Sequence, residues 1–321
     1  MAAPARILLQ TTIPPLNDDW SIGRFSKLTQ LLREVRDEDG APVFAVTARD
    51  RATMDGADPV LSSLDESDFA ALWLFAVDTG EGLSTDECAA ISRFRRRGGG
   101  LMVTRDHMDL GSSVCTLGGV GAAHFFHSRN PEPDASRHKP DDTDTPAISW
   151  PNYHSGANGD PQEIEVVGAL HPVLTDPQNP GGRLHFLPAH PHEGAVGAPA
   201  DDPTARVIAT GRSRSTGAAF NIAVAFERSD DGGRAIAQST FHHFADYNWD
   251  PASGAPSFVS EPPGDGFVRT PEALRQARQY AVNVALWTAG LPLPAEREAQ
   301  EAALDQALKD TFPASDPPAL A

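Results

Sequence analysis

The sequence predicts an α/β protein built on a doubly wound, mostly parallel sheet with an irregular insertion and a β extension. In the N-terminal part, short apolar runs alternate with helical segments, which is the pattern of buried parallel strands covered on both faces. With 321 residues and 40% hydrophobic content, the chain can bury one large core without metals or disulfides. We therefore expect one elaborated domain over residues 1–292, followed by a separate tail.

Four strand units are predicted in the first third of the chain. Apolar residues at helical spacing predict a helix within Ile22–Val35. Ser84 followed by Glu87 forms a capping-box pattern, which predicts a second helix that ends at the glycines 98–100. The apolar runs that predict the strands are Arg6–Thr11, Val43–Thr47, Leu72–Val77 and Leu101–Thr104.

The second half of the chain is less regular. Residues 128–160 are rich in Pro, Asp, His, Asn and Gly, which predicts an irregular insertion or lid. Thr270 and Pro271 start a helix that runs to about Ala289 and closes the domain. Residues 293–321 are expected to add a polar helix, 296–309, and a disordered end. Further strands, some of them antiparallel, are predicted at Glu163–Val167, Arg206–Thr210, Phe220–Phe226 and Arg234–Phe241.

Charge and cysteine content exclude several classes of function. A formal charge of −18 repels nucleic-acid phosphates and anionic membrane surfaces, so neither is expected as a partner, and a small-molecule ligand fits better. The two cysteines, Cys88 and Cys115, form no disulfide framework and no CxxC zinc motif. The first strand begins almost at the N-terminus and no apolar run could span a bilayer, so we expect a cytoplasmic protein. A homo-oligomer is compatible with the sequence.

Five segments occur in an order that is typical of one protein family. They are GGGLMVTRDH, TLGGVGAAHFFHS, LHPVLTDP, STFHHFADYNWD and NVALWTAGL. Because of these segments and their order, the chain resembles the ThuA-like (trehalose utilisation) family of the class I glutamine amidotransferase-like superfamily. The resemblance implies a flavodoxin-like sheet that lacks the reactive Cys after the fourth strand, and a link to carbohydrate metabolism. Family members commonly carry a His after the first strand, whereas this chain has residues 17–20, Asn-Asp-Asp-Trp.

Polar side chains that follow the predicted strands are the candidate site residues. His107 and His243 are predicted to transfer protons because the pKa of histidine lies near neutral pH, and the carboxylate of Asp106 could orient an imidazole or stabilise its charge. Consecutive strand residues face opposite sides, so only one of His242 and His243 is expected in the cleft. The residues expected to contact the ligand are Asp19, Trp20, Asp78, Arg105, His242, Asp246 and Trp249, with Trp249 suited to stacking on a sugar.

We assign no metal and no other cofactor from the sequence. An alternative is a two-histidine, one-carboxylate metal site, although no local motif such as HExxH is present. The members of that site would be His107, one of His242 and His243, and one of Asp19, Asp106 and Asp246.

Two further groups are expected to be inert. The histidines at 185, 190 and 192 are interrupted by prolines, which predicts a surface loop rather than a ligand set. Cys115 lies far from the turn after the fourth strand and is expected to be a small hydrophobic side chain.

The leading functional prediction is hydrolase-type acid/base chemistry on a carbohydrate-like small molecule. One alternative is a non-catalytic sugar-binding or regulatory protein of the same fold. The other is a metal-dependent hydrolase that uses the histidines above. The sequence leaves open whether the chain is an enzyme.

Overall fold

The computed structural model describes residues 3–294, apart from 140, 142, 144 and 231, together with 296, 303 and 307. The predicted polar helix at 296–309 and the C-terminal end lie almost wholly outside the described residues. Within the described part, none of the helices is both long enough and apolar enough to cross a membrane.

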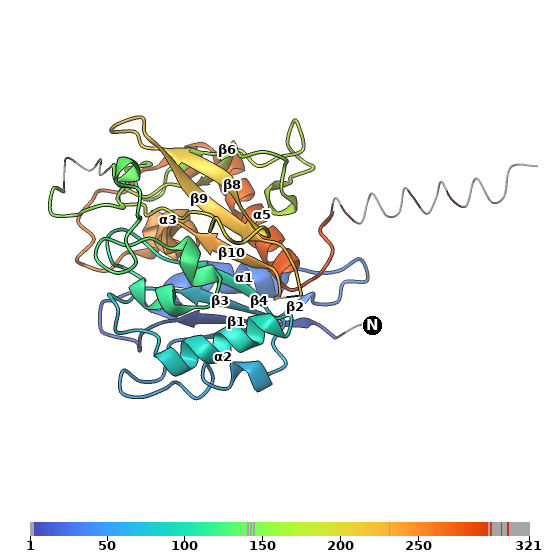
Figure 1. The fold of residues 1–321 in the computed structure, drawn as a ribbon. Coiled ribbons are helices and arrows are strands. Elements are labelled where there is room, and N and C mark those ends of the chain that lie inside the picture. The colour runs from blue at the N-terminus through green and yellow to red at the C-terminus, as the bar shows by residue number, and fades with distance from the viewer. Residues whose placement is uncertain are drawn as a thin grey trace, which may run out of the picture.

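The central element is an eight-stranded sheet with strand order β2-β1-β3-β4-β10-β9-β8-β6 (Figure 1). The first five strands in this order pair in parallel, and the last three pair antiparallel to one another and to β10. The parallel order 2-1-3-4-10 is that of a flavodoxin-like doubly wound sheet, so the predicted fold class is confirmed. The strands are β1 (Ala5–Thr11), β2 (Phe44–Arg49), β3 (Ala71–Phe75), β4 (Gly100–Thr104), β6 (Glu165–Val166), β8 (Ala205–Arg212), β9 (Ala219–Phe226) and β10 (Ala235–Gln238).

Helices cover the parallel half of the sheet on both faces (Figure 1). Side chains alternate along each strand, so Ile7 and Leu9 of β1 belong to one core and Leu8 belongs to the other. The first core is closed by α1 (Ser26–Glu34) and α5 (Pro271–Thr288), and the second by α2 (Thr85–Arg96). The predicted capping box at the start of α2 is present, with both reciprocal hydrogen bonds between Ser84 and Glu87.

The antiparallel half differs in detail from the sequence prediction. The run predicted as one strand at Glu163–Val167 is split between β5 (Pro161–Glu163), which pairs with β7 (Phe186–Pro188) in a small second sheet, and β6. Among its described residues, the segment 128–160 forms no strand and one short 3-10 turn, Ala135–Arg137 (η5). The remaining short helices are η1 (Ile22–Phe25), η2 (Leu64–Glu66), η3 (Ser112–Thr116), η4 (Val120–Ala123), η6 (Pro172–Leu174), η7 (Phe241–His243), α3 (Asp246–Trp249), η8 (Pro251–Ser253) and α4 (Gly266–Arg269).

Candidate functional site

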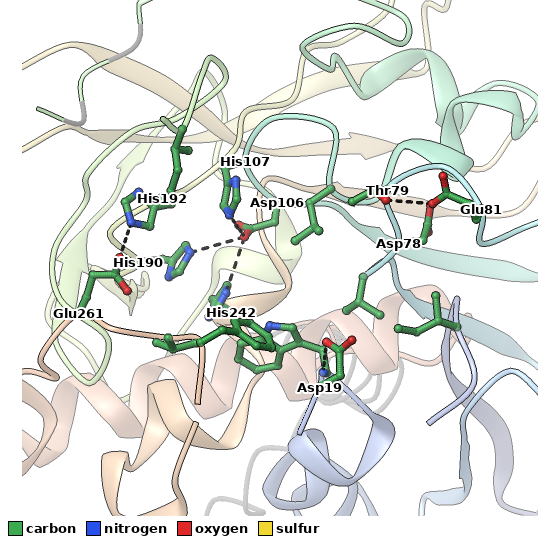
Figure 2. Close-up of a pocket in the computed structure, with 17 residues that line it drawn as sticks. Asp19, Asp78, Thr79, Glu81, Asp106, His107, His190, His192, His242 and Glu261 are labelled. Carbon is green, nitrogen blue, oxygen red and sulfur yellow. Dashed lines mark hydrogen bonds and ion pairs between the residues drawn. The ribbon is translucent and has the colours of Figure 1, made fainter. Parts of the chain in front are cut away.

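A cavity of about 550 Å³ opens at the carboxyl edge of the parallel strands. This is the edge at which doubly wound sheets place their ligands. Its wall comes from the segments that follow β1, β3 and β4, from the loop 190–192, from η7 and from the loop 258–261 (Figure 2). The polar lining residues are Asp19, Asp78, Thr79, Glu81, Asp106, His107, His190, His192, His242 and Glu261.

The turn after β4 places Asp106 at the floor of the cavity. The buried guanidinium of Arg105 donates to the backbone carbonyls of Asp106, at 2.5 Å, and of Met108, also at 2.5 Å, and thereby fixes the turn. Gly194 passes close by, where a Cβ atom would lie 2.6 Å from the carbonyl oxygen of Asp106. Burial lowers the pKa of Arg105 to about 9. Asp106 itself is 1% exposed.

The second residue at the floor of the cavity is His242, which lies on a 3-10 turn and not on a continuation of β10. β10 ends at Gln238, and the hydroxyl of Thr240 then accepts a hydrogen bond from the backbone N–H of His242 and caps η7. The same hydroxyl donates to Asp106 Oδ1 at 2.7 Å. The cap therefore joins His242 and Asp106 in one buried unit.

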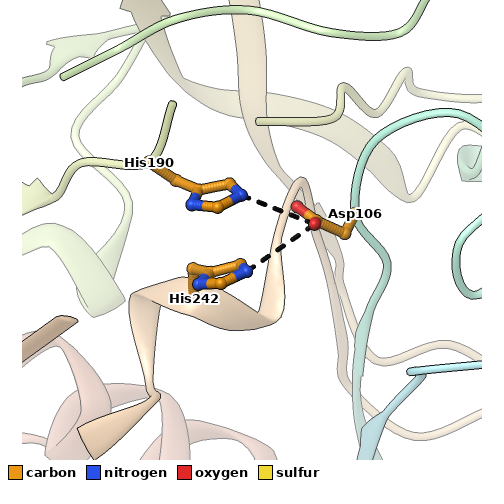
Figure 3. Close-up of side chains that lie close together, drawn as sticks. All are labelled: Asp106, His190 and His242. Carbon is orange, nitrogen blue, oxygen red and sulfur yellow. Dashed lines mark ion pairs between the residues drawn. The ribbon is translucent and has the colours of Figure 1, made fainter. Parts of the chain in front are cut away.

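His190 and His242 stack on each other and direct their Nε2 atoms at the same carboxylate oxygen (Figure 3). Their ring centroids are 3.5 Å apart at an interplanar angle of 12°. The distance to Asp106 Oδ2 is 3.5 Å from His190 Nε2 and 3.7 Å from His242 Nε2. His190 is 5% exposed and His242 is 3% exposed, so the cluster is almost dry.

Hydrogen bonds behind the rings determine which nitrogen carries the proton. Asn248 Nδ2 donates to the carbonyl oxygen of Ala189 at 3.1 Å and to Asn158 Oδ1 at 2.7 Å, which fixes the orientation of both amides. The two amide oxygens then accept from the imidazoles, Asn158 Oδ1 from His190 Nδ1 and Asn248 Oδ1 from His242 Nδ1, each at 2.9 Å. In the neutral rings, both Nε2 atoms therefore present a lone pair to the cavity.

The cluster lacks a positive group at its centre. Burial lowers the pKa of His190 and of His242 well below the ordinary value, which keeps both rings neutral at pH 7. Asp106 Oδ2 and His190 Nε2 have no hydrogen-bond partner among the described residues. Buried polar atoms without partners are costly, and three acceptors that face one point are mutually repulsive.

A divalent metal ion would satisfy these atoms. Asp106, His190 and His242 each offer one ligand atom, and the three atoms lie within 4.8 Å of one another. Tetrahedral zinc bonds of about 2.0–2.1 Å place two donors roughly 3.3 Å apart, so the observed separations of 3.5 and 3.7 Å need to close by only a few tenths of an ångström. With these three residues as ligands, a bound zinc ion would have one position left for water or substrate, as in catalytic zinc sites.

His107 lies beside this cluster, with its ring directed at Asp106 (Figure 2), and it also lines the cavity. Its Nε2 atom is 3.6 Å from Asp106 Oδ2, and its Nδ1 atom has no hydrogen-bond partner among the described residues. Burial lowers its pKa, which the Asp106 carboxylate opposes in part. Because 24% of its side chain is exposed, His107 can contact both Asp106 at the floor and a ligand in the cavity.

Two more residues form the wall next to His190. His192 Nε2 lies 2.9 Å from Glu261 Oε1, and its Nδ1 lies 3.3 Å from the side-chain oxygen of Asn152. This contact connects the loop 190–192 to the loop 258–261, which carries Phe258 and Val259 into the cavity wall.

The structure brings six of the predicted site residues together at the cavity, namely Asp19, Trp20, Asp78, Asp106, His107 and His242. Asp78 has a structural task there, since it accepts from the side chains of Thr12 and Ser113 and from the backbone N–H groups of Gly80 and Ser113. Trp20 packs edge-on against His242, with ring centroids 4.8 Å apart.

Four other predicted residues, Arg105, His243, Asp246 and Trp249, lie outside the cavity. The guanidinium of Arg105 is engaged in the turn behind the floor, and Trp249 is a core residue whose indole donates to the carbonyl of His243. Asp246 caps α1 by accepting from the backbone N–H of Ser26 and of Lys27. The half-buried Cys115 also lies outside the cavity, and burial raises the pKa of its thiol.

The choice between the two adjacent histidines is corrected to His242. His243 is sealed in the core, where its Nε2 donates to Glu193 Oε1 at 3.0 Å. The amide nitrogen of Gln238 lies 2.7 Å from the other ring nitrogen, Nδ1, and the amide oxygen of Gln238 accepts from the hydroxyl of Tyr280. His243 therefore has no position from which to transfer a proton to a ligand.

His190, His192 and Glu261 were not expected at the site. The two histidines flank Pro191 in a stretch that predicts a surface loop, yet both are 5% exposed. The proximity of His190 to Asp106 depends on the packing of the loop 190–192 against η7, which no local pattern encodes. The spacing His190-Pro191-His192 is the sequence feature that could have indicated a pair of site histidines.

No family model and no curated protein match the chain. Among solved structures, similar folds include two proteins described as ThuA-like. The one from Bacteroides uniformis has 13% identity and a TM-score of 0.47, and the match covers 90% of this chain and 93% of that one. The one from Parabacteroides merdae has 11% identity and a TM-score of 0.44, and the match covers 90% of this chain and 91% of that one. The CTPS glutaminase domain of Trypanosoma brucei is similar too (12%, 0.45, 90% and 95%). The neighbours expected from the sequence motifs are thus present among solved structures, and the likeness concerns the fold alone.

Proposed function

We propose that the chain is a metal-dependent hydrolase of carbohydrate-like small molecules, centred on Asp106, His190 and His242. The observation that carries this proposal is the convergence of three buried acceptor atoms with no proton between them. The hydrogen bonds from the two imidazoles to Asn158 and Asn248 leave both Nε2 lone pairs free. A site that only recognised sugar hydroxyls would not require this dry, proton-free centre.

The bound ion would lower the pKa of a coordinated water and polarise the bond to be cleaved. Asp106 supplies the negative charge of the ligand set, and the two neutral imidazoles complete it. His107 lies within reach of the open side, so we assign it the transfer of a proton from the attacking water to the leaving group. Trp20 and the wall at Ile148 and Val259 offer apolar surface on which a sugar ring can pack.

The test starts with the metal. The purified protein is stripped with a chelator, reloaded with zinc, iron or manganese, and analysed for metal stoichiometry. We expect about one ion per chain and a loss of binding of at least tenfold in Asp106→Asn and in His242→Gln. His185→Gln serves as the matched control, because His185 lies in a different cavity.

Activity is then measured on chromogenic glycosides and on esters and amides of sugars. His107→Ala should retain the metal and lose most of the turnover, by roughly 10² to 10⁴-fold. A protein that binds the ion but turns over none of these compounds supports the non-catalytic alternative. Absence of metal binding in the wild-type protein overturns the proposal.

A further inference from the structure

A second cavity, of about 1010 Å³, lies between the small sheet of β5 and β7, strand β8 and the first turns of α5. None of its described lining residues belongs to the cavity of the proposed metal centre. Its volume is at the upper end of the range that small-molecule sites occupy. The second cavity is therefore a separate candidate binding site.

The side chain of Gln162 marks the floor of this second cavity. It is 3% exposed, and its Nε2 atom donates to the carbonyl oxygen of Pro188 at 3.0 Å and to Glu193 Oε2 at 2.6 Å. These two acceptors fix the orientation of the amide. The amide oxygen, Oε1, has no hydrogen-bond partner among the described residues.

Gly211 of β8 lies next to this oxygen and lines the same cavity. A Cβ atom at position 211 would lie 2.6 Å from Gln162 Oε1, so the glycine leaves space that any other residue would fill. A buried amide oxygen without a donor is costly, and water or a ligand usually satisfies it. The floor of the cavity therefore calls for a hydrogen-bond donor.

Arg183 provides the complementary group at the rim of the cavity. Its side chain is exposed, and its guanidinium makes no hydrogen bond or ion pair with a described residue. A guanidinium only donates, whereas the oxygen of Gln162 only accepts. A ligand that satisfies both residues must offer donors and acceptors together, as hydroxyl groups do.

The spacing of these two residues indicates the length of the ligand. Gln162 pairs with Leu187 in the small sheet, and Leu187 lies four residues after Arg183. Along an extended chain, four residues span roughly 13 Å. A chain of two or three sugar rings covers that separation.

The remaining charges at this cavity do not select an ion. Its lining includes three arginines and three glutamates, namely Arg183, Arg212, Arg214, Glu163, Glu165 and Glu272. Arg212 pairs with Glu165 at 3.0 Å, and Glu272 pairs with Arg275 at 2.6 Å. Because these formal charges cancel, a neutral ligand fits the cavity better than a charged one.

Apolar side chains complete the wall. Phe186 is half-buried at the cavity, and Pro161, Ile164 and Pro180 also line it. Sites for small molecules combine such apolar surface with a few polar groups that fix orientation. The C–H face of a sugar ring can pack on this wall while its hydroxyls reach the polar groups.

We propose that the second cavity binds a neutral carbohydrate of two or three rings. One hydroxyl donates to Gln162 Oε1, and another accepts from Arg183. The inference goes beyond the proposed function and does not depend on it, because it concerns a different cavity and requires no metal.

Maltotriose and cellotriose are the probes, because they are neutral, have three rings and differ in the linkage between the rings. Calorimetry on the metal-free protein measures their dissociation constants and that of glucose. We expect at least one trisaccharide to bind about tenfold more tightly than glucose, which is too short to contact both residues. Trigalacturonate, which has the same number of rings but three carboxylates, should bind no more tightly than the better neutral trisaccharide.

Two variants test the cavity from its rim and its floor. Arg183→Ala removes the exposed donor, and Gly211→Ala fills the space beside Gln162 Oε1. Each should weaken binding of the trisaccharide by about tenfold. Circular dichroism verifies that both variants are folded.

Two control variants should bind the trisaccharide like the wild type. Arg228→Ala removes an exposed arginine outside the second cavity, and His107→Ala alters the cavity of the proposed metal centre. The inference is overturned if neither trisaccharide binds, if Arg183→Ala and Gly211→Ala both bind as the wild type does, or if His107→Ala abolishes binding. Metal stoichiometry separates the two proposals, because a protein that binds zinc but no trisaccharide contradicts this inference alone.

Discussion

The side chain of Asn158 offers a sharp test of the proposed metal centre, because it hydrogen-bonds the proposed ligand His190 and is not itself a proposed ligand. Its Oδ1 atom accepts from His190 Nδ1 at 2.9 Å and from Asn248 Nδ2 at 2.7 Å, and Asn248 in turn accepts from His242. Replacing Asn158 by Ala removes the direct support of one imidazole and loosens the support of the other.

The expected loss follows from this double role. Removal of an outer hydrogen-bond partner of a metal-binding histidine typically lowers metal affinity by about 10–100-fold. Since one oxygen supports both rings, we expect Asn158→Ala to lie near about 100-fold, which corresponds to about 2.7 kcal/mol. Asn158→Asp keeps an acceptor at the same place and should bind metal within roughly threefold of the wild type.

Competition with a chromogenic chelator measures the affinities, and circular dichroism verifies that each variant is folded. Asn179→Ala is the control, because Asn179 is also a buried amide with several hydrogen bonds but lies outside the cavity. If folded Asn158→Ala binds zinc as tightly as the wild type, the hydrogen bond from His190 to Asn158 does not contribute to metal affinity, and the proposed orientation of the imidazoles is wrong.

Three further predictions concern the support of the site and the core. Gly194→Ala places a Cβ atom 2.6 Å from the carbonyl of Asp106, so urea unfolding should show a loss of about 1–3 kcal/mol together with weaker metal binding; unchanged stability would contradict the packing. Glu193→Ala leaves the buried ring N–H of His243 without its acceptor, and the free energy of unfolding should fall by about 1–3 kcal/mol; a loss below about 0.5 kcal/mol would contradict this. Burial lowers the pKa of His124 to about 4, so its neutral form is favoured by folding. The stabilisation by neutral His124 is complete above the unfolded-state pKa of about 6.5 and is lost as the pH falls to about 4, by roughly 3 kcal/mol in total. Unfolding experiments on wild type and His124→Gln at a series of pH values measure this loss. The difference in unfolding free energy between the two proteins should become smaller as the pH falls, and a constant difference would contradict the prediction.

Local patterns were sufficient for the parallel half of the fold. The apolar runs of β1, β3 and β4 and the capping box of α2 are short-range features, and the structure has them close to where the sequence places them. The antiparallel half was predicted less well. The break between β5 and β6 depends on two different partner strands, and a single run of residues contains no information on which partner each half will have.

The site shows the same division between local and distant information. The sequence by itself determined that Asp106 and His107 stand at the carboxyl edge of the sheet, because a buried strand delivers the residues that follow it to a fixed place. Only the tertiary structure decided that His242 rather than His243 faces the cavity, and that His190 completes the cluster. The physical reason is that a hydroxyl cap ends β10 and turns the chain at η7, while the loop of His190 reaches Asp106 through packing between segments that are distant in the chain.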